Sequence, residues 1–114
     1  MKIFNKIKGN KGEKIASDYL KKQKYKIIKR NYFSPCGEID IIAQDRDVMV
    51  FVEVKTRTNE KFGFASEAVD FKKQQKIKNA ALLYTQNENI SAIRFDVIEV
   101  YLSSGKLNHI INAF

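Results

Sequence analysis

Acidic and basic side chains interrupt an apolar stretch at residues 37–57. The stretch carries Glu38 and Asp40 in its first half and Glu53 and Lys55 in its second half. Segments that lie in a protein core rarely contain charged groups without a partner or a function. Two carboxylates that converge in a partly dry pocket repel each other unless a cation lies between them, and oxygen ligands suit Mg²⁺ or Mn²⁺ rather than zinc. With a lysine beside them, these groups have the types that metal-assisted phosphodiester hydrolysis requires.

The elements that must position these groups are predicted to be two strands of a hairpin. Residues 38–43 alternate in polarity, residues 48–54 are apolar, and the link between them is polar. A two-residue turn at Asp45-Arg46 would make Asp40 and Glu53 diagonal neighbours on one face, whereas a three-residue turn without a bulge would move Asp40 to the other face. The alternative is a surface hairpin with solvated ion pairs. The position of Glu53 at the end of a hydrophobic strand favours a site.

Composition indicates one small domain with a polyanionic partner. The chain has 114 residues, of which 44% are hydrophobic and 30% are charged, so we expect a single domain over residues 1–114. Lysine and arginine number 21 against 13 acidic residues, and the formal net charge of +8 favours nucleic acid, with anionic membrane as the lesser option. Cys36 is the only cysteine, which excludes an intrachain disulfide. Without a bilayer-spanning run or an apolar signal sequence, we expect a cytoplasmic protein that does not enter the membrane.

The remaining periodicity predicts two helices and three further strands. Apolar spacing of the helical type occurs at residues 12–24 and 67–87, and strand-like runs occur at 25–33, 91–102 and in the last eight residues. Residues 1–11 are basic and contain glycine, and of two alternatives, fraying or contact with phosphate, we expect fraying. In the 91–102 strand, Asp96 is flanked by core residues and is expected to pair with Arg94 or another cation, and His109 is expected to be structural.

Asp40, followed on the next predicted strand by Glu53-Val54-Lys55, resembles the motif of the PD-(D/E)xK nuclease superfamily, which includes archaeal Holliday-junction resolvases. More closely, nearly the whole chain resembles the YraN family of small bacterial proteins. The matching pieces are Gly12-Glu13 with Ala16 and Tyr19-Leu20, Arg30-Asn31-Tyr32, Gly37-Glu38-Ile39-Asp40, Phe51 to Arg57, Ala80-Ala81, Arg94 to Val97 and Asn112-Ala113-Phe114. Two departures are Ile39, where the superfamily often has proline, and Phe33, where relatives are often basic.

The resemblance implies an α/β fold of the restriction-endonuclease type, with a central mixed sheet flanked by helices. It also implies a divalent-metal site on the hairpin, in which Asp40 and Glu53 bind Mg²⁺ or Mn²⁺, with the Val54 carbonyl as a further ligand. Lys55 would orient water or stabilise charge. For Glu13 the pattern alone favours an ordinary role near a helix N-terminus, and the resemblance favours a further carboxylate of the site.

The function that follows is hydrolysis of DNA, which the resemblance favours over RNA, including branched or processed DNA. Because junction resolvases of this fold act as dimers, a homodimer is a further expectation by analogy. Two alternatives remain: a non-catalytic nucleic-acid-binding module, and an interaction adaptor in DNA processing. The residues expected to contact phosphate, rather than to form only a solvated charged face, are Arg57, Lys61, Lys72, Lys73 and Lys76.

Overall fold

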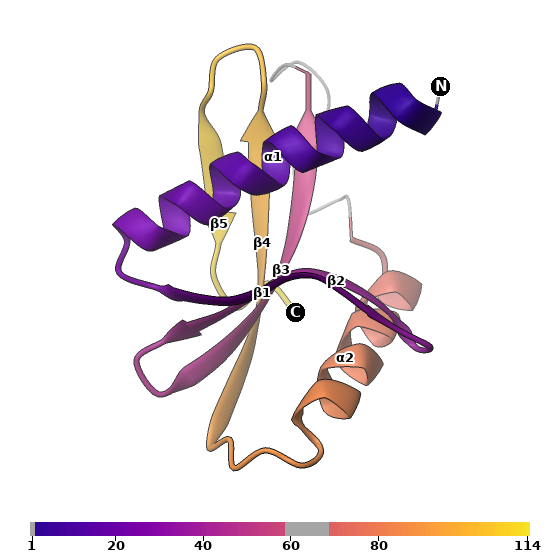
Figure 1. The fold of residues 1–114 in the computed structure, drawn as a ribbon, viewed down its shortest axis with the longest axis vertical. Coiled ribbons are helices and arrows are strands. Elements are labelled where there is room, and N and C mark those ends of the chain that lie inside the picture. The colour runs from indigo at the N-terminus through magenta and orange to yellow at the C-terminus, as the bar shows by residue number, and fades with distance from the viewer. Residues whose placement is uncertain (1, 59–68) are drawn as a thin grey trace.

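Within the described part of the chain, five strands form one mixed sheet with one helix on each face (Figure 1). The structure is a computed structural model that describes residues 2–58 and 69–114, with side chains from residue 9 onward. In chain order the elements are α1 (Lys2–Lys22), β1 (Lys26–Ser34), β2 (Gly37–Asp45), β3 (Val48–Arg57), α2 (Phe71–Thr85), β4 (Ala92–Tyr101) and β5 (Leu107–Ile110). Neighbouring strands follow the sequence from β1 to β5; β3 and β4 are parallel and the other pairs are antiparallel. The predicted α/β fold, a mixed sheet flanked by helices, is confirmed.

The first helix is longer than the sequence indicated, because α1 begins at Lys2 and not at residue 12. Residues 2–11 therefore belong to this helix, and fraying of residues 1–11 stays a prediction. Once a helix has formed, each added residue gains a hydrogen bond for little further entropy, and this stretch contains no proline to stop it. After Lys22, Lys24 adopts a positive φ of 72°, and the Tyr25 N–H donates to the Leu20 carbonyl. This local geometry ends the helix.

The two helices bury their apolar sides against opposite faces of the sheet. Ala16 and Leu20 of α1 pack on the face that carries Val52 of β3. Ile77 of α2 packs on the other face, which carries Phe51. Successive residues of a strand point to opposite faces, so the alternation within β3 supplies both cores. Neither described helix is both long and apolar enough to cross a bilayer.

The hairpin of β2 and β3 forms in a register that differs from the predicted one. Asp45 pairs with Val48 and Ile41 pairs with Val52, so the turn is Arg46-Asp47 and not Asp45-Arg46. Arg46 takes a positive φ of 57°, as tight two-residue hairpin turns require. Because strand partners change by two residues and side chains alternate with a period of two, the side chains of the paired residues 41–45 stay on their predicted faces. Ile39 departs from this alternation, because it packs with Ile42 and Phe51 and not with Ile41.

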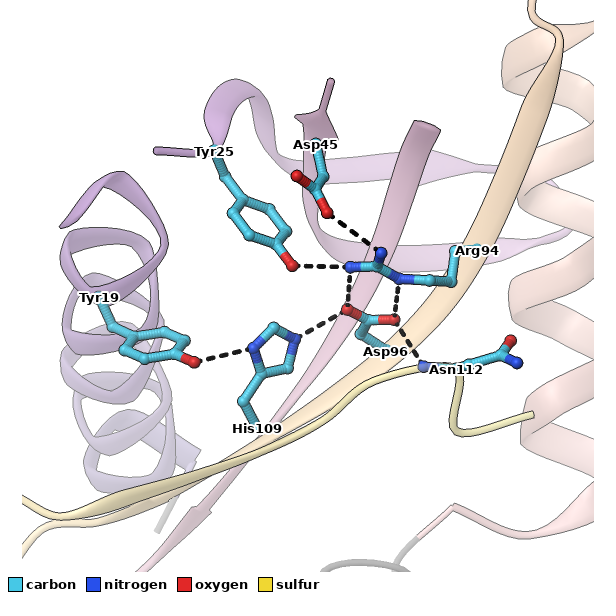
Figure 2. A network of polar contacts seen from close by, with 7 residues as sticks. All are labelled: Tyr19, Tyr25, Asp45, Arg94, Asp96, His109 and Asn112. Atoms are coloured by element: carbon cyan, nitrogen blue, oxygen red, sulfur yellow. Dashed lines mark hydrogen bonds and ion pairs between the residues drawn. The ribbon is translucent and has the colours of Figure 1, made fainter. Parts of the chain in front are cut away.

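A buried polar network ties β4, β5 and the C-terminal residues to α1 (Figure 2). The Asp96 carboxylate is fully buried and accepts hydrogen bonds from the Arg94 guanidinium at 2.8 and 2.9 Å, which confirms the predicted pair. It also contacts His109 Nε2 at 2.7 Å and accepts from the Asn112 backbone N–H at 3.0 Å. Tyr19 Oη of α1 lies 3.0 Å from His109 Nδ1. Burial alone would raise the pKa of Asp96, but these hydrogen bonds lower it below its ordinary value.

Candidate functional site

Asp40 and Glu53 meet where the hydrogen-bonded ladder of β2 and β3 ends. The last pair of that ladder is Ile41 with Val52, so Asp40 and Glu53 are the next residues on the two strands. Asp40 Oδ2 accepts a hydrogen bond of 2.8 Å from the Val54 N–H. Both carboxylates line a cavity of about 280 Å³ whose walls come from β2, β3 and the beginning of α2. The two acidic side chains that the sequence singled out therefore lie in one pocket.

This pocket strongly disfavours a second negative charge. Burial and then the nearby charge of Glu53 raise the pKa of Asp40 from 3.8 to about 8, and the hydrogen bond from Val54 offsets only a part of this shift. Glu53 itself is only 5% exposed. Near neutral pH the pocket therefore either keeps a proton on Asp40 or recruits a cation.

Two lysines reach Glu53 from different elements. Lys73 of α2 places its Nζ 2.6 Å from Glu53 Oε1, and Lys55 of β3 places its Nζ 3.8 Å from the same oxygen. The side chain of Asp70 caps α2 by accepting from the Lys73 N–H at 2.8 Å, and so fixes the turn from which Lys73 extends. Burial, and then the adjacent Lys73 ammonium, lower the pKa of Lys55. Lys73, which the sequence predicts to contact phosphate, thus forms an ion pair with a carboxylate of the pocket.

Glu13 approaches the pocket from α1 because Gly12 allows a close contact between this helix and β3. A Cβ atom at Gly12 would lie 2.1 Å from Thr56 Oγ1, so only glycine permits this approach. Burial raises the pKa of Glu13, Arg30 and Asn31 lower it, and the charge of Glu53 raises it again. Since α1 starts at residue 2, Glu13 lies outside the first helical turn, and an interaction with the helix N-terminus no longer explains it.

The donor set partly fits a divalent metal. One buried oxygen of Glu13, Oε1, has no hydrogen-bond partner, and the carboxylates of Asp40 and Glu53 supply hard oxygen donors that suit Mg²⁺ or Mn²⁺. Among the described residues, however, no three side chains of the His, Cys, Asp and Glu types are placed so that they could hold a metal ion by themselves. The structure therefore brings Glu13 into electrostatic reach of the pair without joining all three into one ligand cluster.

The basic residues predicted to contact nucleic acid occupy different surroundings. Lys72 and Lys76 are exposed on α2, and Lys76 also lines the pocket, whereas Lys61 lies outside the described residues. Arg57 is half-buried, with its Nε 3.6 Å from Glu99 Oε2. Glu99 is buried but was not among the predicted site residues. A carboxylate between Ile98 and Val100 in an apolar strand is the same kind of signal that indicated Glu53.

The family model described as "Uncharacterised protein family UPF0102" matches residues 12–100, and the chain belongs to this family. A UPF0102 protein of Caldanaerobacter subterraneus is 52% identical over 120 residues, which cover 99% of this chain and 98% of that protein. A UPF0102 protein of Clostridioides difficile is 53% identical and covers 96% of this chain and 98% of its own length. A third, from Dictyoglomus thermophilum, is 47% identical with the same coverage of both chains. The matched region contains all the lining residues of the pocket described above, and it also contains Glu13.

Proposed function

We propose that this member of the UPF0102 family hydrolyses phosphodiester bonds of DNA with a divalent metal ion at the Asp40–Glu53 pocket. The observation that carries the proposal is the burial of two carboxylates, Asp40 and Glu53, in one pocket. The pKa of Asp40 is raised to about 8, and the amino group of Lys55 lies beside Glu53 on the same strand, β3. Such a pocket gains stability when a cation enters it. The mixed sheet and the order of Asp40 on β2 and Glu53-Val54-Lys55 on β3 support membership of the PD-(D/E)xK superfamily.

Each residue of the pocket has a distinct role in this proposal. Asp40 and Glu53 would hold Mg²⁺ or Mn²⁺, with the Val54 carbonyl as a further ligand, and the bound ion would polarise the phosphate and activate water. Lys55, whose pKa is lowered by burial and by Lys73, would position that water or stabilise charge on the phosphate oxygens. Glu13 would contribute its unpartnered oxygen through a bridging water.

The excess of basic residues supports a nucleic-acid substrate. The formal net charge is +8, and Lys72 and Lys76 are exposed on the helix that forms one wall of the pocket. A positive surface beside a buried acidic pocket would draw in a polyanion and leave only the reacting phosphate at the carboxylates. DNA as the substrate and a homodimer as the active form are parts of this proposal, and sedimentation of the protein with and without DNA tests the second.

One observation favours a second candidate, a DNA-binding module without catalysis. The Lys73 ammonium lies 2.6 Å from Glu53 Oε1 and already supplies a cation to the pocket from within the chain. If Lys73 remains there when the protein is loaded with metal salts and DNA, the pocket is a neutralised ion pair and not a metal centre. Exposed phosphate contacts would then be the whole function.

The test is incubation with linear, flapped and branched DNAs in Mg²⁺ or Mn²⁺, with the parent protein, Lys55→Ala and Lys106→Ala compared. Lys106 is exposed in the turn between β4 and β5, so its variant matches the change in charge away from the pocket. We expect metal-dependent cleavage by the parent and by Lys106→Ala, and none by Lys55→Ala. DNA binding without cleavage by any protein would support the module, and equal cleavage by all three would show that another site or a contaminant is responsible.

A further inference from the structure

A second charged cluster lies on the same face of the sheet as Glu53 and Lys55. Arg57 follows Lys55 by two residues on β3, so the two side chains share a face at a spacing of about 6.6 Å along the strand. The parallel register of β3 and β4 pairs Lys55 with Glu99, and Arg57 with Tyr101. Glu99 therefore lies directly beside Lys55 and, with Arg57, extends the line of charged side chains from Glu53 toward the ends of β3 and β4.

Burial of the Glu99 carboxylate is costly and calls for an explanation. Its side chain is 2% exposed, and one oxygen, Oε1, accepts a hydrogen bond from the Tyr101 hydroxyl. The other oxygen, Oε2, forms no hydrogen bond and faces Arg57 Nε at 3.6 Å. A buried ion pair is often no more stabilising than well-packed apolar side chains of similar volume, so stability alone does not account for Glu99 at this position.

What the pair does achieve is to hold one edge of the Arg57 guanidinium. The Nε atom of Arg57 is buried against Glu99, while the Arg57 side chain as a whole remains 32% exposed. The solvent-accessible part of the side chain is therefore not the edge that faces Glu99. The Arg57 carbonyl is itself fixed, because it accepts a hydrogen bond of 2.9 Å from the Leu102 N–H. An arginine held in this way needs little further ordering to bind a phosphate through its terminal N–H groups.

We propose that Arg57, held in position by Glu99, binds a DNA phosphate adjacent to the phosphate at the Asp40–Glu53 pocket. Arg57 makes the contact and Glu99 is the positioning residue. The proposal rests on the proposed function, because it assumes that a phosphodiester backbone runs along β3 past Glu53, Lys55 and Arg57. It goes beyond it by assigning a second phosphate position and a role for a carboxylate that would otherwise repel DNA.

The sign of one mutational effect tests this assignment. Glu99→Gln removes a negative charge, and simple electrostatics predicts that the more basic variant binds DNA more tightly. Loss of the Arg57 anchor predicts the reverse, a weakening of about three- to tenfold. Binding is measured by fluorescence anisotropy with labelled duplex and single-stranded DNA in EDTA, which prevents cleavage, over about 50–200 mM salt. Circular dichroism in the same buffers confirms that each variant is folded.

The matched charge control uses Arg46, which is exposed in the turn at the opposite end of β3. We expect Arg57→Gln to reduce the slope of log affinity against log salt by about 0.9, as for one lost phosphate contact, and Arg46→Gln to leave the slope unchanged. Arg57→Lys keeps the charge and guards against loss of folding; it should bind more weakly than the parent because lysine lacks the planar fork. In the Arg57→Gln background, Glu99→Gln should no longer weaken binding.

The outcomes separate this inference from the proposed function. If the parent protein does not bind DNA at low salt, the proposed function fails. If the parent binds but Glu99→Gln binds equally or more tightly, or Arg57→Gln has the same salt slope as Arg46→Gln, the second phosphate position is wrong and the pocket remains. If Glu99→Gln does not fold, equal affinity of Arg57→Lys and the parent overturns the assignment, because charge alone would then be sufficient.

Discussion

Replacing Asp40 with asparagine should stabilise the metal-free protein, by an amount that grows with pH. Folding raises the pKa of Asp40 from 3.8 to about 8, through burial and through the charge of Glu53. A group whose pKa is raised in the folded state contributes stability below its unfolded-state pKa and loses that contribution as the pH rises through the folded-state pKa. The parent should therefore lose about 1.4 kcal/mol of stability per pH unit from this group between about pH 4 and pH 8. Asparagine does not ionise and avoids the loss.

The magnitude follows from the two pKa values. The difference in unfolding free energy between Asp40→Asn and the parent should be below about 1 kcal/mol at pH 4, about 3 kcal/mol at pH 6 and up to about 6 kcal/mol above pH 8. The hydrogen bond from the Val54 N–H to the side chain of residue 40 should survive, because the asparagine carbonyl oxygen also accepts. The variant therefore removes the ionisation of residue 40 and changes little else.

Urea unfolding in EDTA at pH 4, 6 and 8.5 measures this difference. Asp47→Asn is the matched control, because Asp47 is exposed in the turn between β2 and β3 and lies outside the pocket. We expect its difference from the parent to stay small throughout. Two results would refute the reasoning that burial and Glu53 raise the pKa of Asp40. One is a difference in unfolding free energy between Asp40→Asn and the parent that does not change between pH 4 and 8.5, and the other is a variant less stable than the parent at pH 8.5.

Three further predictions concern the metal, the buried network and the first helix. Calorimetry should show Mg²⁺ or Mn²⁺ binding that weakens sharply in Glu53→Gln; unchanged affinity would contradict the metal site. Asp96→Asn should destabilise the protein by about 3–5 kcal/mol in urea unfolding near neutral pH. Because folding lowers the pKa of Asp96, the contribution of its charge should disappear as the pH falls through that lowered value. Gly12→Ala should lower the free energy of unfolding by about 1–3 kcal/mol, because its Cβ would meet Thr56. Gly9→Ala, with open space at its Cβ, should raise the free energy of unfolding by up to about 1 kcal/mol. Equal effects of the two substitutions would contradict the close contact at Gly12.

Local alternation was sufficient to predict which side chains share the pocket face, even though the hairpin register was wrong. The predicted partner of Ile42 was Met49, and the observed partner is Phe51. A change of two residues preserves the faces within the paired segment 41–45, and Asp40, just beyond it, still lines one pocket with Glu53. A change of one residue would have separated them. The prediction therefore depended on the period of the strand and not on the identity of the turn.

Contacts that depend on packing between distant elements could not be predicted from the sequence. A lysine-rich helix such as α2 has several equivalent cations in its first two turns, and nothing in the pattern distinguishes Lys73 from Lys72 or Lys76. The distinction arises because α2 packs over the hairpin with Lys73 half-buried and its ammonium on Glu53. In the same way, the pairing of Lys55 with Glu99 follows from the parallel register of β3 and β4, whose connection runs through α2.

The two glycines of α1 show the same limit in one element. Glycine within a helix costs about 1 kcal/mol relative to alanine, so Gly9 and Gly12 both look unfavourable in the pattern. The structure separates them, because a Cβ at Gly9 would meet nothing within 4 Å and a Cβ at Gly12 would collide with Thr56. The close approach that Gly12 permits is also what carries Glu13 toward Glu53. The cost of glycine in the helix at position 12 is therefore explained by the placement of Glu13 near Glu53, which lies forty positions later in the sequence.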